Sequence, residues 1–178
     1  STEVKKEPFV LINPNGRLPA IEDTNTGIIL WKSGAIVEYL VETYDKDNKI
    51  NFQAGNPEYF HAKQWIHPQV SKQGPYFGQA HPKNIPSAKE RYKNEVLRMS
   101  EILNNVPRDR EYLADRRFSY ADASFLPCYN VFGHVADNEI DLEKEFPNLN
   151  SWLERMRERP AMVKISKDKE NALANQLR

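Results

Sequence analysis

The sequence predicts a small α/β unit followed by an all-α unit, and the pattern changes near residue 50. Up to Tyr44, short apolar runs of strand length lie between helical patterns, whereas later apolar residues recur at helical spacing. The polar residues between these two patterns are typical of a linker. We therefore predict an α/β domain over residues 1–45, a linker over 46–52 and an all-helical domain over 53–178.

The α/β unit is expected to contain two short strands between helical segments. A short helical piece is predicted around residues 7–11, and strands are predicted near 18–21 and 28–31. A helix follows from Ser33, because apolar residues recur there three and four positions apart. The predicted apolar stripe of this helix consists of Ile36, Tyr39 and Leu40.

The all-α unit shows apolar stripes at alternating spacings of three and four residues, which predict amphipathic helices. The longest stripe is Tyr92, Val96, Met99, Leu103 and Val106, and a second is Leu149, Trp152, Leu153 and Met156. Pro68 and Pro127 lie inside other helical patterns and are expected to kink or end them. Ser119 and Asp122 have the spacing of a capping box, which we interpret as a folding element. The charged residues 164–178 predict an outer helix.

Composition and charge exclude several classes of function. Lys plus Arg and Asp plus Glu both number 25, so no overall field would attract nucleic acid or an anionic membrane. The single cysteine, Cys128, rules out an internal disulfide framework and fits a reducing compartment. The apolar runs are too short to cross a bilayer, and the histidines lack the spacing of a metal site. We predict a cytoplasmic protein with no metal, membrane or nucleic-acid partner.

The most informative stretch runs from a tight turn at residues 13–17 to the helix that begins at Ser33. The turn leads into Leu18–Pro19, an X-Pro bond between a turn and a strand, which is a candidate cis peptide. A serine that opens a helix offers a hydroxyl and free N–H groups to a carboxylate. Together these features favour binding of a short anionic peptide in extended form, and glutathione is such a peptide.

A series of short motifs is spread over most of the chain. They are residues 13–20, 33–36, 73–80, 118–122, 141–148 and 158–161. In order and spacing, this series resembles the glutathione transferase superfamily, in particular the fungal transferases related to the yeast nitrogen-catabolite regulator. The resemblance implies a partial thioredoxin-like domain, then a glutathione-transferase-type helical bundle, assembled as a homodimer.

One part of the family fold has no counterpart in this sequence. The family's first strand, first helix and second strand would precede Ser1. A naturally short protein, a truncated product and residues outside the given sequence are three explanations that stay open. We expect a shortened chain, whose two strands need support from the helical domain or a partner subunit.

The resemblance implies a glutathione site with one unusual member. The backbone at Leu18 and Pro19 would pair with the cysteinyl part of glutathione, and Ser33 would bind the γ-glutamyl carboxylate. Lys32 stands where the family normally has an acid that receives the γ-glutamyl ammonium. Three alternatives follow for glutathione: it binds more weakly, it binds in a shifted pose, or the partner subunit supplies the missing acid. Arg17 and Lys5 are alternative candidates for the glycine carboxylate, although a solvated surface charge is the simpler interpretation of each.

No residue matches the family position that hydrogen-bonds the glutathione sulfur and stabilises its thiolate. The catalytic residue is therefore unknown, and Asn15 and Tyr76 are candidate stand-ins. Aromatic and polar residues of the helical domain would line the pocket for the electrophile, although they could equally be packing residues. These candidates are Tyr76, Phe77, Phe125, Tyr129 and Asn130.

The resemblance implies a glutathione-dependent enzyme that adds the glutathione thiolate to an apolar conjugated electrophile. Release of the adduct would make it a transferase, whereas addition, rotation and expulsion of the sulfur would make it a cis/trans isomerase. A fungal secondary-metabolite pathway is the expected setting. The alternative is a non-catalytic regulatory or dimerisation module, which Lys32 and the unmatched activating position would suit.

Overall fold

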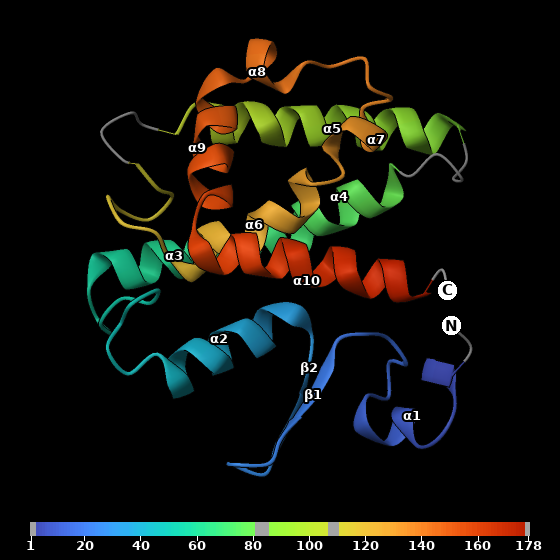
Figure 1. The fold of residues 1–178 in the computed structure, drawn as a ribbon, viewed down its shortest axis with the longest axis vertical. Coiled ribbons are helices and arrows are strands. Elements are labelled where there is room, and N and C mark those ends of the chain that lie inside the picture. The colour runs from blue at the N-terminus through green and yellow to red at the C-terminus, as the bar shows by residue number, and fades with distance from the viewer. Residues whose placement is uncertain (1–2, 81–85, 107–110, 177–178) are drawn as a thin grey trace.

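The computed structural model describes residues 3–80, 86–106 and 111–176, and it confirms the predicted fold class of an α/β part followed by helices. The α/β part lies at the bottom of Figure 1, and the helical part lies above it. The elements of the α/β part are η1 (Glu3–Lys5), α1 (Phe9–Ile12), β1 (Ala20–Asp23), β2 (Ile28–Trp31) and α2 (Ser33–Tyr44).

The two strands form an antiparallel hairpin in which Ala20 pairs with Trp31 and Asp23 with Ile28. Gly27 lies in the connecting turn with φ of +73°, a conformation that glycine adopts without strain. The Leu18–Pro19 bond immediately before β1 is cis, as predicted. This bond and the turn before it place the backbone of residues 17–19 at one end of the hairpin.

Helix α2 joins the hairpin to the helical part through a stripe that differs from the predicted one. Ile36 and Val41 are buried, whereas Leu40 is 40% exposed, so the prediction that Leu40 belongs to the core-facing stripe was wrong. The apolar face of α2 contacts a cluster that includes Ala62 and Ile66. The orientation of the helix therefore follows from this packing and not from its own periodicity alone.

The helical part is arranged around three crossing helices in its core. Its elements are α3 (Pro57–Pro68), η2 (Gln69–Gln73), α4 (Gly74–Gln79), α5 (Pro86–Asn104), α6 (Tyr120–Tyr129), α7 (Phe132–Val135), α8 (Leu142–Glu145), α9 (Pro147–Arg157) and α10 (Pro160–Gln176). Side chains of α5, α6 and α9 form most of the main core. All four residues of the stripe predicted on α9 are buried. The predicted outer helix is α10, whose described residues are mostly exposed.

Pro68 ends the α-helical hydrogen-bond pattern of α3, as its position in the sequence predicts. Proline has no N–H, and its ring clashes with the preceding turn of an α-helix. The chain stays helical but widens into a π-helix, η2, before it returns to α-helix at Gly74. From residue 69 onward, side chains therefore point in other directions than a continuous α-helix would give them. This segment lies opposite the start of α2.

Asp122 is a fully buried carboxylate that holds three segments of the helical part together. Its Oδ2 accepts hydrogen bonds from the N–H and the hydroxyl of Ser119, at 2.9 and 2.7 Å. Its Oδ1 accepts from the N–H of Leu113 at 2.8 Å and from Nε1 of Trp152 at 3.0 Å. Burial raises the pKa of this carboxyl, and the four donors oppose that effect. The capping-box prediction is confirmed, and the residue also anchors α9.

We expect Asp122→Ala to lower the free energy of unfolding by about 3 kcal/mol or more, because it leaves several buried donors without an acceptor. Urea denaturation followed by circular dichroism measures this change. Asp141→Ala is the matched control: Asp141 caps the exposed helix α8, and its loss should cost about 1 kcal/mol or less. Equal losses in the two variants would contradict the anchoring role of Asp122.

Candidate functional site

A cleft of about 650 Å³ lies between the α/β part and the segment η2–α4. Three stretches that are far apart in the sequence form its walls: the turn before β1, the junction of β2 and α2, and the helical turns after Pro68. The lining residues are Asn13, Asn15, Arg17, Leu18, Pro19, Trp31, Lys32, Ser33, Gly34, Ala35, Val70, Ser71 and Gly74.

The turn before β1 is held by a buried asparagine. Asn13 is 2% exposed, and its side-chain amide donates to the carbonyl oxygen of Arg17. Its Oδ1 accepts the N–H of Asn15 at 3.0 Å. Gly16 has φ of +57°, and a Cβ there would lie 2.9 Å from the backbone oxygen of Val4. These contacts fix the loop that carries Arg17 and Leu18 at the edge of the cleft.

The first turn of α2 forms the second wall. Lys32 precedes the helix with φ of +77° and ψ of 120°, a rare backbone conformation for a residue with a side chain. Ser33 is the first helical residue, so its N–H and the next two have no acceptor within the helix. A ligand carboxylate placed there would meet these N–H groups and the positive end of the helix dipole.

The third wall approaches α2 very closely at one glycine. A Cβ added to Gly34 would lie 3.0 Å from Cγ1 of Val70, so any larger side chain would press on η2. Ser71, on the same turn, donates its hydroxyl hydrogen bond to the carbonyl oxygen of His67 at 2.7 Å. The absence of a side chain at Gly34 therefore allows the helix start and η2 to face one cleft.

A hydrogen-bonded cluster fixes α2 to the hairpin. The hydroxyls of Tyr39 and Tyr44 both donate to Oδ2 of Asp23, the former at 2.6 Å. These bonds, that of Tyr39 first, lower the pKa of Asp23 from 3.8 to about 2. Because Asp23 ends β1 and the tyrosines lie on α2, the cluster sets the helix position relative to the Leu18–Pro19 edge.

The structure brings the predicted glutathione-site residues together. Leu18, Pro19, Lys32, Ser33 and Arg17 all line the cleft, although they come from two separate stretches. The candidate stand-in Asn15 lines it as well. Their roles in binding and catalysis stay predictions, since geometry alone does not test them.

The residues predicted to line an electrophile pocket lie elsewhere. Phe77, Phe125 and Tyr129 are 5%, 0% and 3% exposed and belong to the main core. Tyr76 packs against that core with its ring 6.1 Å from that of Tyr92, and Asn130 is exposed at the end of α6. None of these five lines the cleft. On α6, the ring of Phe125 meets Trp152 of α9 and the ring of Tyr129 meets Phe77 of α4.

Trp31, Val70 and Ser71 also line the cleft, beside Gly74, and none of these three was predicted as a site residue from the sequence. The sequence signal for the wall formed by η2 was Pro68, which predicts a break in the helix. Pro68 does not predict the direction in which the later side chains point. An apolar cavity of about 520 Å³ adjoins this wall and shares Ser33 and Gly34 with the cleft. The opposite face of α6, through Ala123, Ser124 and Pro127, contributes to that cavity.

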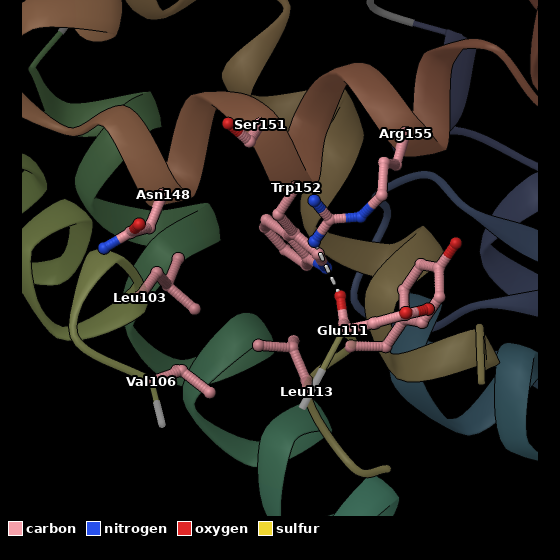
Figure 2. Close-up of a pocket in the computed structure, with 9 residues that line it drawn as sticks. Leu103, Val106, Glu111, Leu113, Asn148, Ser151, Trp152 and Arg155 are labelled. Atoms are coloured by element: carbon pink, nitrogen blue, oxygen red, sulfur yellow. Dashed lines mark hydrogen bonds between the residues drawn. The ribbon is translucent and has the colours of Figure 1, made fainter. Parts of the chain in front are cut away.

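Another cavity, of about 360 Å³, lies between α5, α9 and the chain before α6 (Figure 2). Arg155 lies at its edge and donates to the carbonyl oxygen of Glu111 at 2.8 Å. Trp152 forms its inner wall, and the indole N–H of this residue donates a hydrogen bond to Asp122. This cavity shares no lining residue with the cleft, and the side chains of Asn148, Trp152 and Arg155 are engaged in structural hydrogen bonds.

The only cysteine of the sequence is not a candidate nucleophile. Burial raises the pKa of the Cys128 thiol to about 11, so very little of it is ionised at neutral pH. Within the described ranges, no group of three or more histidine, cysteine or acidic side chains could hold a metal ion. Nor is any described helix long and apolar enough to cross a membrane. None of the described residues that line the cleft is a cysteine.

The sequence matches two domain families in the same order as the structure. Residues 2–42 match the glutathione S-transferase N-terminal domain, and residues 57–160 match the C-terminal domain. The chain belongs to the glutathione S-transferase family. It is 41% identical to the glutathione S-transferase-like protein gedE of Aspergillus terreus, over 92% of this chain and 79% of that protein.

Solved structures place the chain in the Ure2-like branch of this family. The glutathione transferase URE2P6 of Phanerochaete chrysosporium, in complex with oxidized glutathione, has 39% identity and a TM-score of 0.88. The match covers 95% of this chain and 80% of that one. Ure2p5 of the same organism, cocrystallized with 1-(S-glutathionyl)-2,4-dinitrobenzene, has 33% identity and a TM-score of 0.86 over 93% and 80% of the two chains. The recognised family is confirmed.

The hydrogen bonds from Tyr39 and Tyr44 to Asp23 make the attachment of α2 to the hairpin sensitive to acid. Because its pKa in the folded protein is depressed, Asp23 contributes stability above about pH 4, and this stability is lost as the pH falls toward 2. We expect the difference in thermal stability between the wild type and a Tyr39→Phe, Tyr44→Phe variant to narrow from pH 5 to pH 2.5. Melting curves at the two pH values measure it, and a constant difference would contradict the role of the cluster.

Proposed function

We propose that this chain is a glutathione-dependent enzyme whose cleft binds glutathione between the Leu18–Pro19 edge and the start of α2. The observation that carries the proposal is the convergence on one cleft of a free backbone edge, a helix N-terminus and cationic side chains. Glutathione transferases of the same fold have been solved with glutathione or its conjugates. We also propose that the domain boundary lies within residues 46–52 and that the enzyme is a cytoplasmic homodimer.

Ser33 would bind the γ-glutamyl carboxylate. Its hydroxyl and the N–H groups of the first helical turn are charge-assisted donors to such a group, together worth about 1–2 kcal/mol when partly buried. The backbone of Leu18 would pair with the cysteinyl residue as one strand of a miniature sheet. Arg17, on the same edge, would face the glycine carboxylate.

The electrophile would lie against the wall that η2, α4 and the end of β2 form together. Val70 of η2 and Trp31 of β2 supply apolar surface there, and Gly74 of α4 leaves room beside them. The ligand in the Ure2p5 structure is a glutathione conjugate of an aromatic electrophile. This wall replaces the aromatic residues of the core as our candidate for the electrophile site.

The reaction would begin with attack of the glutathione thiolate on an activated carbon. A thiol with an ordinary pKa near 8.5 is only a few per cent ionised at pH 7, so a donor to the sulfur would raise the rate. Asn15 is the candidate donor among the described residues of the cleft. Tyr76 is less suited to this role, because it packs against the core and away from the cleft lining.

Two outcomes of this attack fit an apolar conjugated substrate. In a transferase the adduct leaves, and one glutathione is consumed per turnover. In an isomerase the sulfur adds to a conjugated double bond, the new single bond rotates, and the sulfur is expelled with no net consumption. We propose a specialised enzyme of fungal secondary metabolism, because Lys32 departs from the pattern of a general transferase.

We expect Ser33→Ala to raise the glutathione Kd about 2- to 12-fold, or about 0.5–1.5 kcal/mol, because it removes the hydroxyl and leaves the N–H groups of the helix start. Isothermal titration calorimetry with millimolar glutathione measures this change. Ser71→Ala is the matched control, because its hydroxyl lines the same cleft but is bonded to His67; its Kd should stay within about twofold of wild type. No binding to the wild-type protein would leave only a non-catalytic module.

We expect catalysis with a conjugated enone or polyene, and a mass balance of glutathione decides its type. Chromatography of the reaction should show either an adduct with equal loss of glutathione, or an isomerised product with glutathione unchanged. The control reaction uses S-methylglutathione, whose sulfur cannot form the thiolate. Turnover with that analogue would contradict thiolate attack.

A further inference from the structure

The cleft carries positive charge that nothing in its lining balances. Arg17 and Lys32 both line it, and its described lining contains no aspartate or glutamate. Lys5 adds a third cation at the rim, where its Nζ donates to the carbonyl oxygen of Asn15 at 3.3 Å. In the described ranges, neither Arg17 nor Lys32 forms an ion pair.

Three carboxylates of the hairpin and α2 are committed to other partners. Asp23 accepts from the two tyrosine hydroxyls of α2. Glu38 and Glu42, further along α2, both pair with Lys63 of α3, at 3.7 and 3.0 Å. The hydrogen bonds from Lys63 and Tyr59 also lower the pKa of Glu42, so it stays ionised in that cluster. If the side chain of any of these acids turned into the cleft, it would lose its hydrogen bond or ion pair, and these contacts hold α2 in place.

Lys32 sits at the point where a bound carboxylate would meet the helix start. It directly precedes Ser33, and its carbonyl oxygen accepts the N–H of Ile36 at 3.0 Å, so its backbone belongs to the cap of α2. The residue keeps a positive φ despite having a side chain. Lys32 lines the cleft directly before the site proposed for the γ-glutamyl group, which in glutathione carries a carboxylate and an ammonium.

We propose that Lys32 makes the cleft selective for γ-glutamyl-type thiols in which the glutamyl nitrogen carries no positive charge. This inference rests on the proposed function and names the substrate class of the same site. A carboxylate at the helix start is attracted by Lys32 and by the helix dipole, whereas an adjacent ammonium is repelled by Lys32. Acylated or deaminated γ-glutamyl thiols keep the attraction and remove the repulsion.

The test compares glutathione with glutaryl-cysteinyl-glycine, which lacks only the amino group. Isothermal titration calorimetry on the full chain should give a Kd for the deaminated thiol about fivefold lower than that for glutathione, the size expected for two charges about 4 Å apart in water. Lys32→Met should bring the two Kd values together, and Lys32→Glu should reverse their order. Lys46→Glu, at the far end of α2, makes the same charge change outside the cleft and should leave the ratio unchanged.

The outcomes separate this inference from the proposed function. If neither thiol binds the wild type, the proposed function fails. If both bind and glutathione binds equally well or better, the site exists but Lys32 does not select against the ammonium, and the inference is overturned. The wild-type comparison needs no variant, and thermal melts check that each variant is folded before its ratio is used.

Discussion

The packing of α2 against the helical part is the constraint on which the cleft depends. A two-stranded hairpin is marginal on its own, so the α/β part takes its stability from this contact and from the Asp23 cluster. The contact is close at Gly34, where only a hydrogen atom separates the backbone from Val70. Any shift of α2 would move Ser33 away from Leu18 or from η2, and the three walls would no longer face one volume.

The local features of the site could be predicted from the sequence, because each depends on a few neighbouring residues. The cis bond before Pro19 and the helix start at Ser33 follow from the chemistry of proline and of helix ends. The capping box follows from the spacing of Ser119 and Asp122. Each of these features is specified by neighbouring residues, and the order of the motifs then indicated the family.

The part that Val70 and Trp31 play in the cleft could not be predicted, and neither could the burial of Phe125 and Tyr129, because aromatic residues have the same chemistry in a core and in a pocket. Phe125 and Tyr129 lie on a helix whose two faces are both apolar, and tertiary packing decides which face is covered. The stripe of α2 was misassigned at Leu40 for the same reason. The π-helix after Pro68 adds a further rotation that periodicity alone does not contain, so the position of Val70 becomes apparent only in three dimensions.

The positive charges of the cleft act on a ligand only over a short range. The whole chain carries equal numbers of acidic and basic residues, so no long-range field steers ligands toward the site. At physiological salt the screening length is about 8 Å, so a ligand experiences Arg17 and Lys32 only once it has entered the cleft. Discrimination between an ammonium and a neutral group should then appear in the dissociation rate, while association stays similar for both ligands. The selectivity that we propose therefore depends on where the backbone presents these two side chains, which is set by the cap of α2 and by the turn held by Asn13.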